Sequence, residues 1–549
     1  MFANKRQSVL LGLFALIFGF LNVYVYFIEK ELLKNQFDIL ILITNVLIVA
    51  SLTYILVSKL YAKRKKIADR IYQSTQNEKS ISSKRYFFAV FIIQFILWLP
   101  VFLAYYPGIF SYDVGTQLPQ TIGAPGPNPP GYSTYQPLAH TVYIQFFYYI
   151  IGEKIFGNSN IGIAFASVTQ MIIFSLMMSF THLYLYKVKV KKIIRYILIV
   201  VTGVSPFFSM LSISTTKDTF FTGFFAMLFV CLCCYIKKPM LYSESKLLTV
   251  IYTISIAGTM LFRNNGIYCV AAFVVVLLIK AIKKKRYRFF VYTAVGVLVG
   301  LIISGSLNLY LKAEKGSVNE MLSVPFQQIA CTYIDHKDEL SQEDIEQVLS
   351  ILPDSDRYNP YRSDTVKISA AGSGNAKKML QDLASIYIKL GLRYPGSYVK
   401  AFTQLNAGYF SLADTSYSEI YGKGDSSGVL LSGFHSDSLL PKKHKFVQNS
   451  YLPLLESKYE ELYTDNKYLN IFGINILFSP ALYFWTIVLL MVFAIISRKY
   501  KTIPLLIFLG IFILTLLAAP CVLIRYALPY IVCVPLLITC VMEKTEEKQ

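Results

Sequence analysis

Five ionisable residues stand at the edges of long apolar segments of this chain, namely Asp113, Lys217, Asp218, Arg263 and Arg525. An ionised side chain beside hydrocarbon costs roughly 2.5 to 3.5 kcal/mol unless it is solvated or paired, so each is a candidate functional residue. A positioned carboxylate can take a proton from a hydroxyl group, and fixed cations stabilise charge that builds on a phosphate in a water-poor site. The set therefore favours chemistry on a lipid-linked phosphate, with Asp113 as general base and the three cations on the phosphate.

Each of these residues also has a structural explanation. Aspartate is common at helix N-caps and in turns, which would account for Asp113 and, before the next apolar segment, for Asp218. Lys217 could extend its ammonium group to lipid headgroups. Arg263 closes an apolar segment, where arginine often anchors a helix at the interface. Arg525 interrupts an apolar run and needs a partner or an aqueous cavity, which favours a functional role.

One such reaction moves a sugar from a lipid-linked phosphate to a hydroxyl group. Polar and aromatic residues near Asp113 could bind that sugar. They are Tyr105, Tyr106, Tyr112, Gln117 and Tyr135. His140 could serve as a base or a ligand, but a lone histidine in the context QPLAHT is more often a hydrogen-bonded structural residue.

The composition defines the class of protein that positions these residues. The chain has 549 residues, of which 55% are hydrophobic and 15% charged, and this excludes an ordinary soluble domain. The formal net charge of +21 does not indicate nucleic-acid binding. Residues 312–470 are slightly acidic, and the positive excess lies in short loops between apolar segments, as membrane orientation signals do. Of the eight cysteines, only Cys331 lies away from the apolar segments, so no outward disulfide framework is expected.

Segments of about 20 apolar residues predict membrane-spanning helices, and twelve are expected. They cover about 8–28, 38–60, 86–104, 159–186, 196–213, 220–236, 247–262, 267–282, 289–311, 471–496, 502–519 and 527–542. Five loops rich in Lys and Arg separate them, at 61–85, 187–195, 237–246, 283–288 and 498–501. With both termini in the cytoplasm, all five loops fall on the cytoplasmic face.

This topology predicts three parts: a membrane domain over 1–311, an extracytoplasmic domain over 312–470 and a final membrane domain over 471–549. The outer loop 105–158 would carry Asp113. Within it, the segment 121–137 is dense in Pro and Gly and excludes a helix, whereas 140–156 predicts an amphipathic helix in the membrane interface.

The extracytoplasmic domain is expected to be mainly helical. A surface helix is predicted over 335–352, a second over about 375–391, and another within 393–410. The Gly- and Ser-rich segment 422–433 predicts a loop.

Short motifs along the apolar part of the chain resemble the GT-C superfamily of integral membrane glycosyltransferases, and in particular a bacterial group whose first large outer loop reads YPG…D…Q. The matching residues are Tyr106, Pro107, Gly108, Asp113 and Gln117, then Gln136, Pro137 and His140, then Lys217 and Asp218, then Arg263, Asn264, Asn265 and Gly266, and finally Arg525, Tyr526 and Pro529.

The resemblance implies an all-α, GT-C-like polytopic fold whose first outer loop carries the catalytic acid, here Asp113. It also implies a polyprenyl-phosphate sugar as donor and transfer, usually with inversion, on the extracytoplasmic side of a bacterial plasma membrane. The acceptor would be a cell-envelope glycan or glycolipid. The substrate-binding residues would be Asp218, Tyr106, Tyr112, Gln117, His140, Asn264 and Tyr526, with Lys217, Arg263 and Arg525 on the donor phosphate.

Many members of that superfamily have two adjacent acids in the first outer loop, whereas Tyr112 precedes Asp113 here. A second carboxylate must therefore come from elsewhere, such as Asp218, or be dispensable. Some members use a divalent cation, Mg²⁺ or Mn²⁺, and this remains open, with no metal ligand assigned.

Two other functions fit twelve spans with charged residues: a transporter or lipid-linked-glycan flippase, and a non-catalytic assembly or polymer-length factor. The enzyme is favoured over a carrier because the polar residues gather at one predicted face and the two halves show no repeat.

Overall fold

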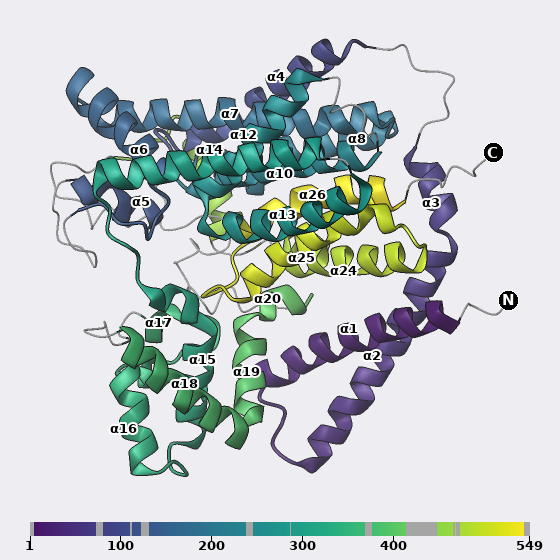
Figure 1. The fold of residues 1–549 in the computed structure, drawn as a ribbon, viewed down its shortest axis with the longest axis vertical. Helices are drawn as coiled ribbons and strands as arrows, with labels where there is room; N and C mark the ends of the chain where they lie inside the picture. Colours follow the sequence, from purple (N-terminus) through teal and green to yellow (C-terminus); the bar gives the residue numbers. More distant parts are fainter. Residues whose placement is uncertain are drawn as a thin grey trace.

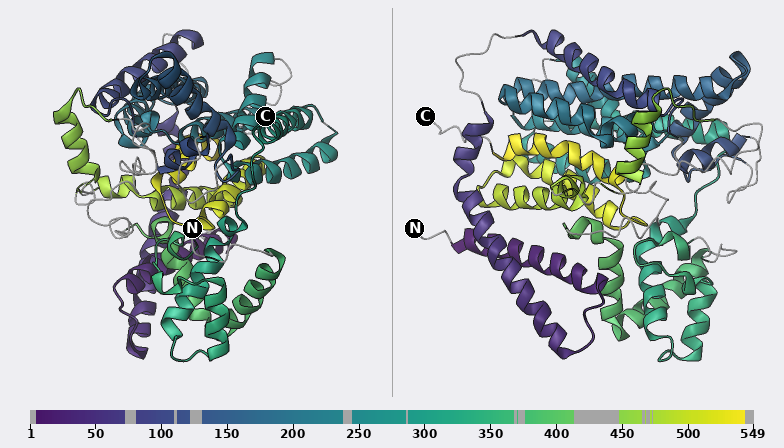
Figure 2. Two further views of the ribbon diagram at one scale, coloured as in Figure 1. Left: turned by 90° about the vertical axis from the view of Figure 1, so that its left-hand side faces the viewer. Right: turned by 180° about the vertical axis from the view of Figure 1, so that it is seen from behind.

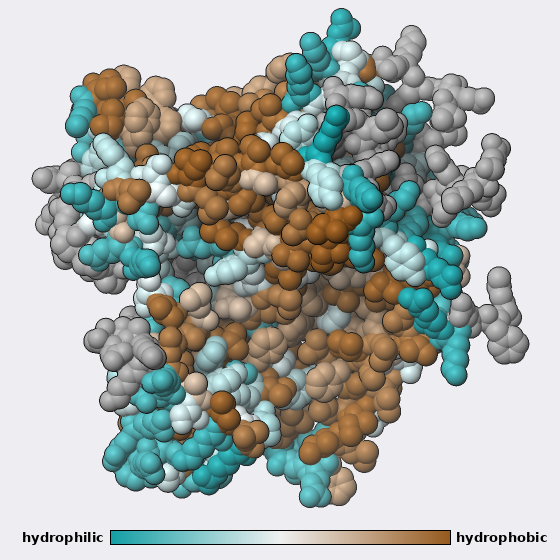
Figure 3. Space-filling view, in the orientation of Figure 1, coloured by the Kyte–Doolittle hydropathy of each residue, from teal (hydrophilic) through white to brown (hydrophobic). Residues whose placement is uncertain are grey.

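The computed structural model describes residues 5–72, 81–109, 112–121, 131–237, 245–285, 287–367, 370, 376–412, 447–464, 467, 471 and 473–542. Over these residues the protein is a bundle of long helices with a group of shorter helices beside it, and no strand is present (Figure 1). The expected all-α polytopic membrane class is confirmed at this level. The apolar surface runs across the bundle, and polar surface gathers over the shorter helices (Figure 3).

Within the described residues, nine helices are long and apolar enough to cross a membrane. They are α1 (Lys5–Glu29), α2 (Gln36–Ala62), α4 (Ser83–Ala104), α7 (Ser159–Lys187), α10 (Lys217–Lys237), α13 (Asn264–Lys284), α14 (Arg288–Leu311), α25 (Ile503–Leu517) with the turn Tyr500–Thr502 before it, and α26 (Ile524–Val541). A tenth span would come from the pair α8 (Lys192–Val204) and α9 (Pro206–Ile213), which is bent by 46° at Ser205.

All twelve expected segments contain a helix, but the count of twelve spans stays a prediction. The helices α12 (Lys246–Phe262) and α24 (Pro480–Ile496) have 17 residues each, which is short for a span. The segment 471–496 is also divided, because the short helix α23 (Ile474–Phe478) ends before Pro480 begins α24. Proline at a first helical position is favourable, while inside a helix it breaks the hydrogen-bond ladder.

The bundle has two chemically different ends. Three of the five basic segments meet at one of them: Lys191 N donates to Ile71 O, Lys237 Nζ lies 5.9 Å from the Tyr72 ring centroid, and the Tyr72 hydroxyl donates to Thr539 O. The start of α1 and the end of α26 lie there too, beside α3 (Arg64–Ile71), and α5 (Tyr112–Gln117) lies at the opposite end (Figures 1 and 2). Lys217 begins α10 and Arg525 is the second residue of α26, so both helices run from the α5 end to the basic end.

The outer loop folds into a compact layer over the α5 end. After α5 come the 3-10 turn η1 (Leu118–Thr121), the helix α6 (Leu138–Gln145) and the π-helical segment η2 (Phe146–Ile155). The predicted amphipathic helix over 140–156 is therefore present as α6 followed by η2. It packs against α7 through Tyr143, whose hydroxyl donates to Ala166 O at 2.7 Å.

The shorter helices of the 312–470 segment have a hydrophobic core of their own, built around Phe326, Val348 and Ile386. They are η3 (Val318–Leu322), α15 (Ser323–His336), α16 (Gln342–Ile351), η4 (Ser355–Arg357), α17 (Asp364–Lys367), α18 (Ala376–Arg393) and α19 (Pro395–Leu405), followed by α20 (Ala407–Phe410), α22 (Pro453–Tyr459) and η8 (Glu460–Thr464). The mainly helical character expected of this segment holds for its described residues.

One of the helix boundaries predicted for this segment is wrong. The single helix expected over 335–352 is two helices, because the chain turns after His336 and Ser341 then caps α16 by accepting from Asp344 N. The helix expected near 375–391 is α18. The loop expected over 422–433 lies outside the described residues.

The segment after α19 joins the membrane bundle rather than the separate core. Tyr409 and Phe410 of α20 belong to the main hydrophobic core, and the Trp485 indole donates to Phe410 O at 2.8 Å. The Asn406 amide donates to Leu517 O. Earlier in the chain, just before α17, Ser363 N donates to Pro520 O at 2.9 Å. These bonds fasten the 312–470 segment to the turn that leads into Arg525.

Candidate functional site

Backbone pairing brings the Asp113 loop next to the start of α10. Ile109 N donates to Ile213 O at 3.1 Å, and Thr215 N donates to Ile109 O at 3.0 Å. Just before this pairing, Gly108 has φ +149°, and a Cβ atom there would lie 2.1 Å from Ser167 Oγ of α7. Only glycine allows both this backbone conformation and this approach. The glycine of the YPG motif therefore allows the loop that carries Asp113 to pack closely against α7 and the end of α9.

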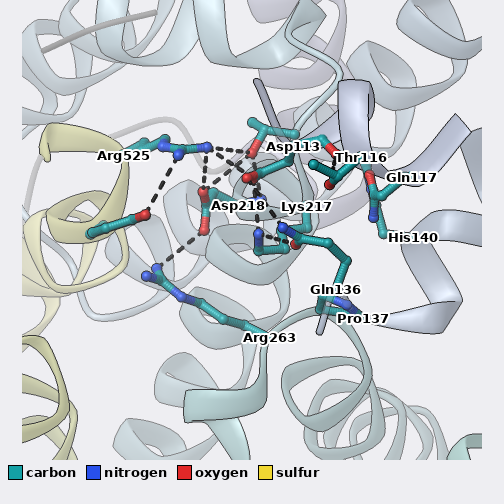
Figure 4. A network of polar contacts seen from close by, with 12 residues as sticks. Asp113, Thr116, Gln117, Gln136, Pro137, His140, Lys217, Asp218, Arg263 and Arg525 are labelled. Atoms are coloured by element: carbon teal, nitrogen blue, oxygen red, sulfur yellow. Dashed lines mark hydrogen bonds and ion pairs between the residues drawn. The ribbon is translucent and has the colours of Figure 1, made fainter. Parts of the chain in front are cut away.

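Asp113 lies at the centre of an ion-pair cluster at this end of the bundle (Figure 4). Its Oδ2 atom accepts from Lys217 Nζ at 2.9 Å and from Arg525 Nη1 at 3.0 Å. Its Oδ1 atom accepts a longer bond from Gln136 Nε2 at 3.5 Å, and Lys217 also donates to the Gln136 amide oxygen. Three chain segments far apart in sequence thus converge on one carboxylate.

Asp218 is the second carboxylate of the cluster and lies between two arginines. Its Oδ1 is 3.1 Å from Arg263 Nη1, and its Oδ2 is 3.4 Å from Arg525 Nη1. Thr216 Oγ1 donates to Asp218 Oδ2 at 3.2 Å and accepts from Arg525 at 3.3 Å. The alternative that Asp218 is a helix N-cap is wrong, because α10 begins one residue earlier, at Lys217.

The two arginines share one aromatic ring. The guanidinium carbon of Arg263 lies 4.2 Å from the Tyr526 ring centroid, and that of Arg525 lies 5.0 Å from it. Arg263 reaches this position from a tight corner between α12 and α13, where Gly266 N donates to Arg263 O and a Cβ atom on Gly266 would lie 2.0 Å from Thr259 O. The cation–π contacts hold both guanidinium groups beside the carboxylates.

The cluster is buried and has an excess of positive charge. Lys217, Arg263 and Arg525 carry three positive charges against two negative charges on Asp113 and Asp218, which leaves +1. Arg263, Arg525 and Asp113 are each 7% exposed or less, and Asp218 is 1% exposed. Buried ionic groups are costly unless their charges are balanced. The arrangement is therefore suited to a bound anion.

Burial opposes ionisation of Asp113, but the Lys217 ammonium and the Arg525 guanidinium outweigh it and hold the pKa of this carboxyl group well below its usual range. Asp113 is thus ionised at neutral pH. While it holds both cations it is also a weak base, because basicity falls with the pKa of the conjugate acid.

A second polar chain connects α5 to α6 beside the cluster. The Gln117 side chain contacts His140 Nδ1 at 2.9 Å through Oε1 and donates to Thr141 Oγ1 at 3.1 Å through Nε2. Gln145 Nε2 donates to Gln117 O at 2.8 Å. Burial, followed by the Lys217 charge, lowers the pKa of His140 to about 3, so its ring is neutral.

The structure brings together most of the residues that the sequence singled out. Asp113, Lys217, Asp218, Arg263, Arg525 and Tyr526 form the cluster, and Gln117 and His140 adjoin it. Sequence reasoning left out Gln136 and Thr216 as site residues, although Gln136 is among the residues that match the GT-C pattern and Thr216 directly precedes Lys217.

Two other predicted site residues have different surroundings. The Tyr106 ring packs against Tyr451 with ring centroids 5.1 Å apart, and Asn264 is exposed at the start of α13. Its neighbour Asn265 instead donates to Thr515 Oγ1 at 3.4 Å. The side chain of Tyr112 lies outside the described structure.

The described residues do not fit a divalent cation at this site. Both carboxylates are already held by basic side chains, and the part of the chain that the structure describes has no group of three or more His, Cys, Asp or Glu residues placed to hold a metal ion.

Comparison with known proteins gives a family without an assigned role. The model of a family of unknown function, DUF6020, matches residues 127–549, which include four of the five charged residues of the cluster and leave out Asp113. No curated protein and no solved structure matches the chain.

Proposed function

Because the chain belongs to the family of unknown function DUF6020, we propose its function from the site itself: it is a membrane glycosyltransferase that moves a sugar from a polyprenyl-phosphate donor to a cell-envelope glycan or glycolipid. The observation that carries this proposal is the carboxylate of Asp113, held by Lys217 and Arg525 in a buried, net cationic cluster at one end of an apolar bundle.

The donor phosphate is the anion that the excess charge suits. A sugar linked through one phosphate is a phosphodiester with a single negative charge, which would neutralise the +1 of the cluster. Arginine binds phosphate oxygens through paired N–H groups, and Arg263 and Arg525 present theirs on two sides of Asp218. The lipid tail would lie among the apolar helices.

Donor binding also explains how Asp113, a weak base while it is paired with Lys217 and Arg525, can act as the general base. When the donor phosphate forms ion pairs with Lys217 and Arg525, these cations interact less with Asp113. The Asp113 carboxylate then becomes more basic. Asp113 then accepts the proton of the acceptor hydroxyl as the hydroxyl oxygen bonds to the anomeric carbon of the sugar. The bond from that carbon to the phosphate oxygen breaks, and the lipid phosphate leaves with the electron pair, stabilised by the cations. Attack opposite the leaving group inverts the anomeric centre.

We place the cluster on the extracytoplasmic side of a bacterial plasma membrane, with both termini in the cytoplasm. The support is that three of the five basic segments meet at the opposite end of the bundle, and Lys and Arg accumulate in cytoplasmic loops. The cluster lies at the first turns of α10 and α26 rather than halfway along them, which favours a surface enzyme over a carrier with a midplane site.

The test is transfer by the purified protein from a labelled polyprenyl-phosphate sugar to envelope glycan or glycolipid. Wild type should release lipid phosphate, and Asp113→Asn should lower the rate by at least about 100-fold, since a general base contributes roughly 10²–10⁴. Asp218→Asn is the matched control, because it removes the other carboxylate of the same cluster without removing the base. The transfer rate of Asp218→Asn should fall less than that of Asp113→Asn.

Two results would overturn the proposal. Equal losses in the two variants would mean that only the charge balance of the cluster matters. Passage of the intact donor across sealed vesicles, with no lipid phosphate released, would make the protein a carrier.

A further inference from the structure

His140 has one ring nitrogen that nothing in the described structure uses. The residue lies on α6 and is 0% exposed. Its Nδ1 atom is 2.9 Å from Gln117 Oε1, whereas Nε2 is buried and has no hydrogen-bond partner among the described residues. Buried polar atoms are nearly always paired, so an unpartnered one calls for an explanation.

The hydrogen-bond chain assigns the tautomer of this ring. The Thr141 hydroxyl donates its only proton to Pro137 O at 3.3 Å, so it accepts from Gln117 Nε2 at 3.1 Å. The other end of the Gln117 amide is therefore its carbonyl oxygen, which faces His140 Nδ1 and requires a proton on that nitrogen. His140 Nε2 then carries a bare lone pair, which can only accept a hydrogen bond.

The His140 ring is linked to the ion-pair cluster through Gln117 and α5. Gln117 follows Asp113 by four residues on α5, which puts both side chains on the same face of the helix, one turn apart. Burial lowers the pKa of His140, as does the Lys217 charge, whereas the Asp113 and Asp218 charges raise it. Because the ring is neutral, it does not compete with Asp113 for the two cations.

We propose that His140 Nε2 accepts a hydrogen bond from a hydroxyl group of the sugar bound beside Asp113. This assignment rests on the proposed function and specifies a contact of the same site. An uncharged acceptor in a dry site can bind a hydroxyl group, and it has no proton to donate to a second carboxylate. The sugar concerned belongs either to the donor or to the acceptor, and both present hydroxyl groups within one sugar width of the reacting atoms.

Two substitutions separate this role from a structural one. In His140→Asn the amide nitrogen takes the place of Nδ1, so the bond to Gln117 is kept and the acceptor at Nε2 is lost. In His140→Gln the amide reaches the place of Nε2, so an acceptor is kept and the bond to Gln117 is lost. Melting temperature reports whether each variant is folded, and the transfer assay gives KM for each substrate.

We expect His140→Asn to raise one KM by at least about tenfold and His140→Gln to raise it less, since sites built to bind a hydroxyl group lose much when that bond is removed. A change in the donor KM, also seen as slower hydrolysis of donor alone, assigns the hydroxyl group to the donor sugar. A change confined to the acceptor KM assigns it to the acceptor.

The opposite order would overturn the assignment: if His140→Gln is the more damaged variant, the residue only positions Gln117. Wild-type kinetics in His140→Asn would overturn it equally. If the wild-type protein releases no lipid phosphate, the proposed function is refuted. The proposed hydrogen bond between the sugar and His140 is then refuted as well.

Discussion

Asp113 brings a negative charge into a buried site, and its two cationic partners make the stability of the protein depend on pH. The folded pKa of this carboxyl group lies below its unfolded value of about 3.9. A depressed folded pKa means that the ionised group stabilises the fold at pH above the unfolded value, and that this contribution disappears as pH falls through the folded value.

We therefore expect the melting temperature of Asp113→Asn to lie below that of the wild type at neutral pH, and the difference to shrink as pH falls below about 4. Breaking a buried ion pair from one side typically costs about 3 to 5 kcal/mol, so the difference at neutral pH should be several degrees or more. Thermal unfolding in detergent at pH 7, 5 and 3 measures it. A difference that is unchanged at pH 3 would contradict the pairing of Asp113 with Lys217 and Arg525.

At the scale of single residues, charge was the signal that sequence reasoning could use. Arg525 could be singled out because a charge inside an apolar run must find a partner, and the structure supplies Asp113 and Asp218. Thr216 and Gln136 give no such signal, because an uncharged hydroxyl or amide is tolerated in many environments. Asn264 is exposed while the next residue, Asn265, donates to Thr515 Oγ1, because one step along a helix turns a side chain by about 100°.

At the scale of elements, the apolar segments located the helices, but not where helices break. Ser205 divides α8 from α9, and Ser479 divides α23 from α24, in stretches whose hydrophobicity is continuous. The pairing of residue 109 with residues 213–215 is also invisible in sequence, because it joins a loop to a helix end about a hundred residues away. This pairing is what places Asp113 beside Lys217.

Gly108→Ala should disrupt this pairing. The added Cβ atom would meet Ser167 Oγ at 2.1 Å and Ile213 O at 3.0 Å, so the loop must move away from α7 and carry Asp113 with it. We expect transfer activity to fall at least about tenfold and the melting temperature to drop by several degrees.

Gly131→Ala is the matched control for Gly108→Ala. Gly131 also has a positive φ, +134°, but a Cβ atom there meets nothing within 4 Å. It therefore bears the backbone strain without the collision. If the two variants lose the same activity, the close approach to α7 is not what positions Asp113.

At the scale of the whole molecule, the two ends of the bundle predict opposite accessibility. Leu392 of α18 is 81% exposed, and Lys65 of α3 is exposed at the basic end. In intact cells a membrane-impermeant maleimide should label Leu392→Cys, and should label Lys65→Cys only after permeabilisation. The native cysteines give little background, because seven are buried and Cys234 is partly buried. The reverse pattern would put the cluster in the cytoplasm and refute the proposed orientation.

The pairing of Lys217 and Arg525 with Asp113 also weakens the binding of small free anions. Any small anion from the surroundings, such as inorganic phosphate or sulfate, must displace a carboxylate that is already in place and cannot leave. Such an ion has no other binding energy to offset that displacement. A ligand anchored in the bilayer gains additional binding energy from its long hydrocarbon chain. Under the proposed function, the internal carboxylate thus acts as a tethered competitor that disfavours small free anions relative to a lipid-anchored donor.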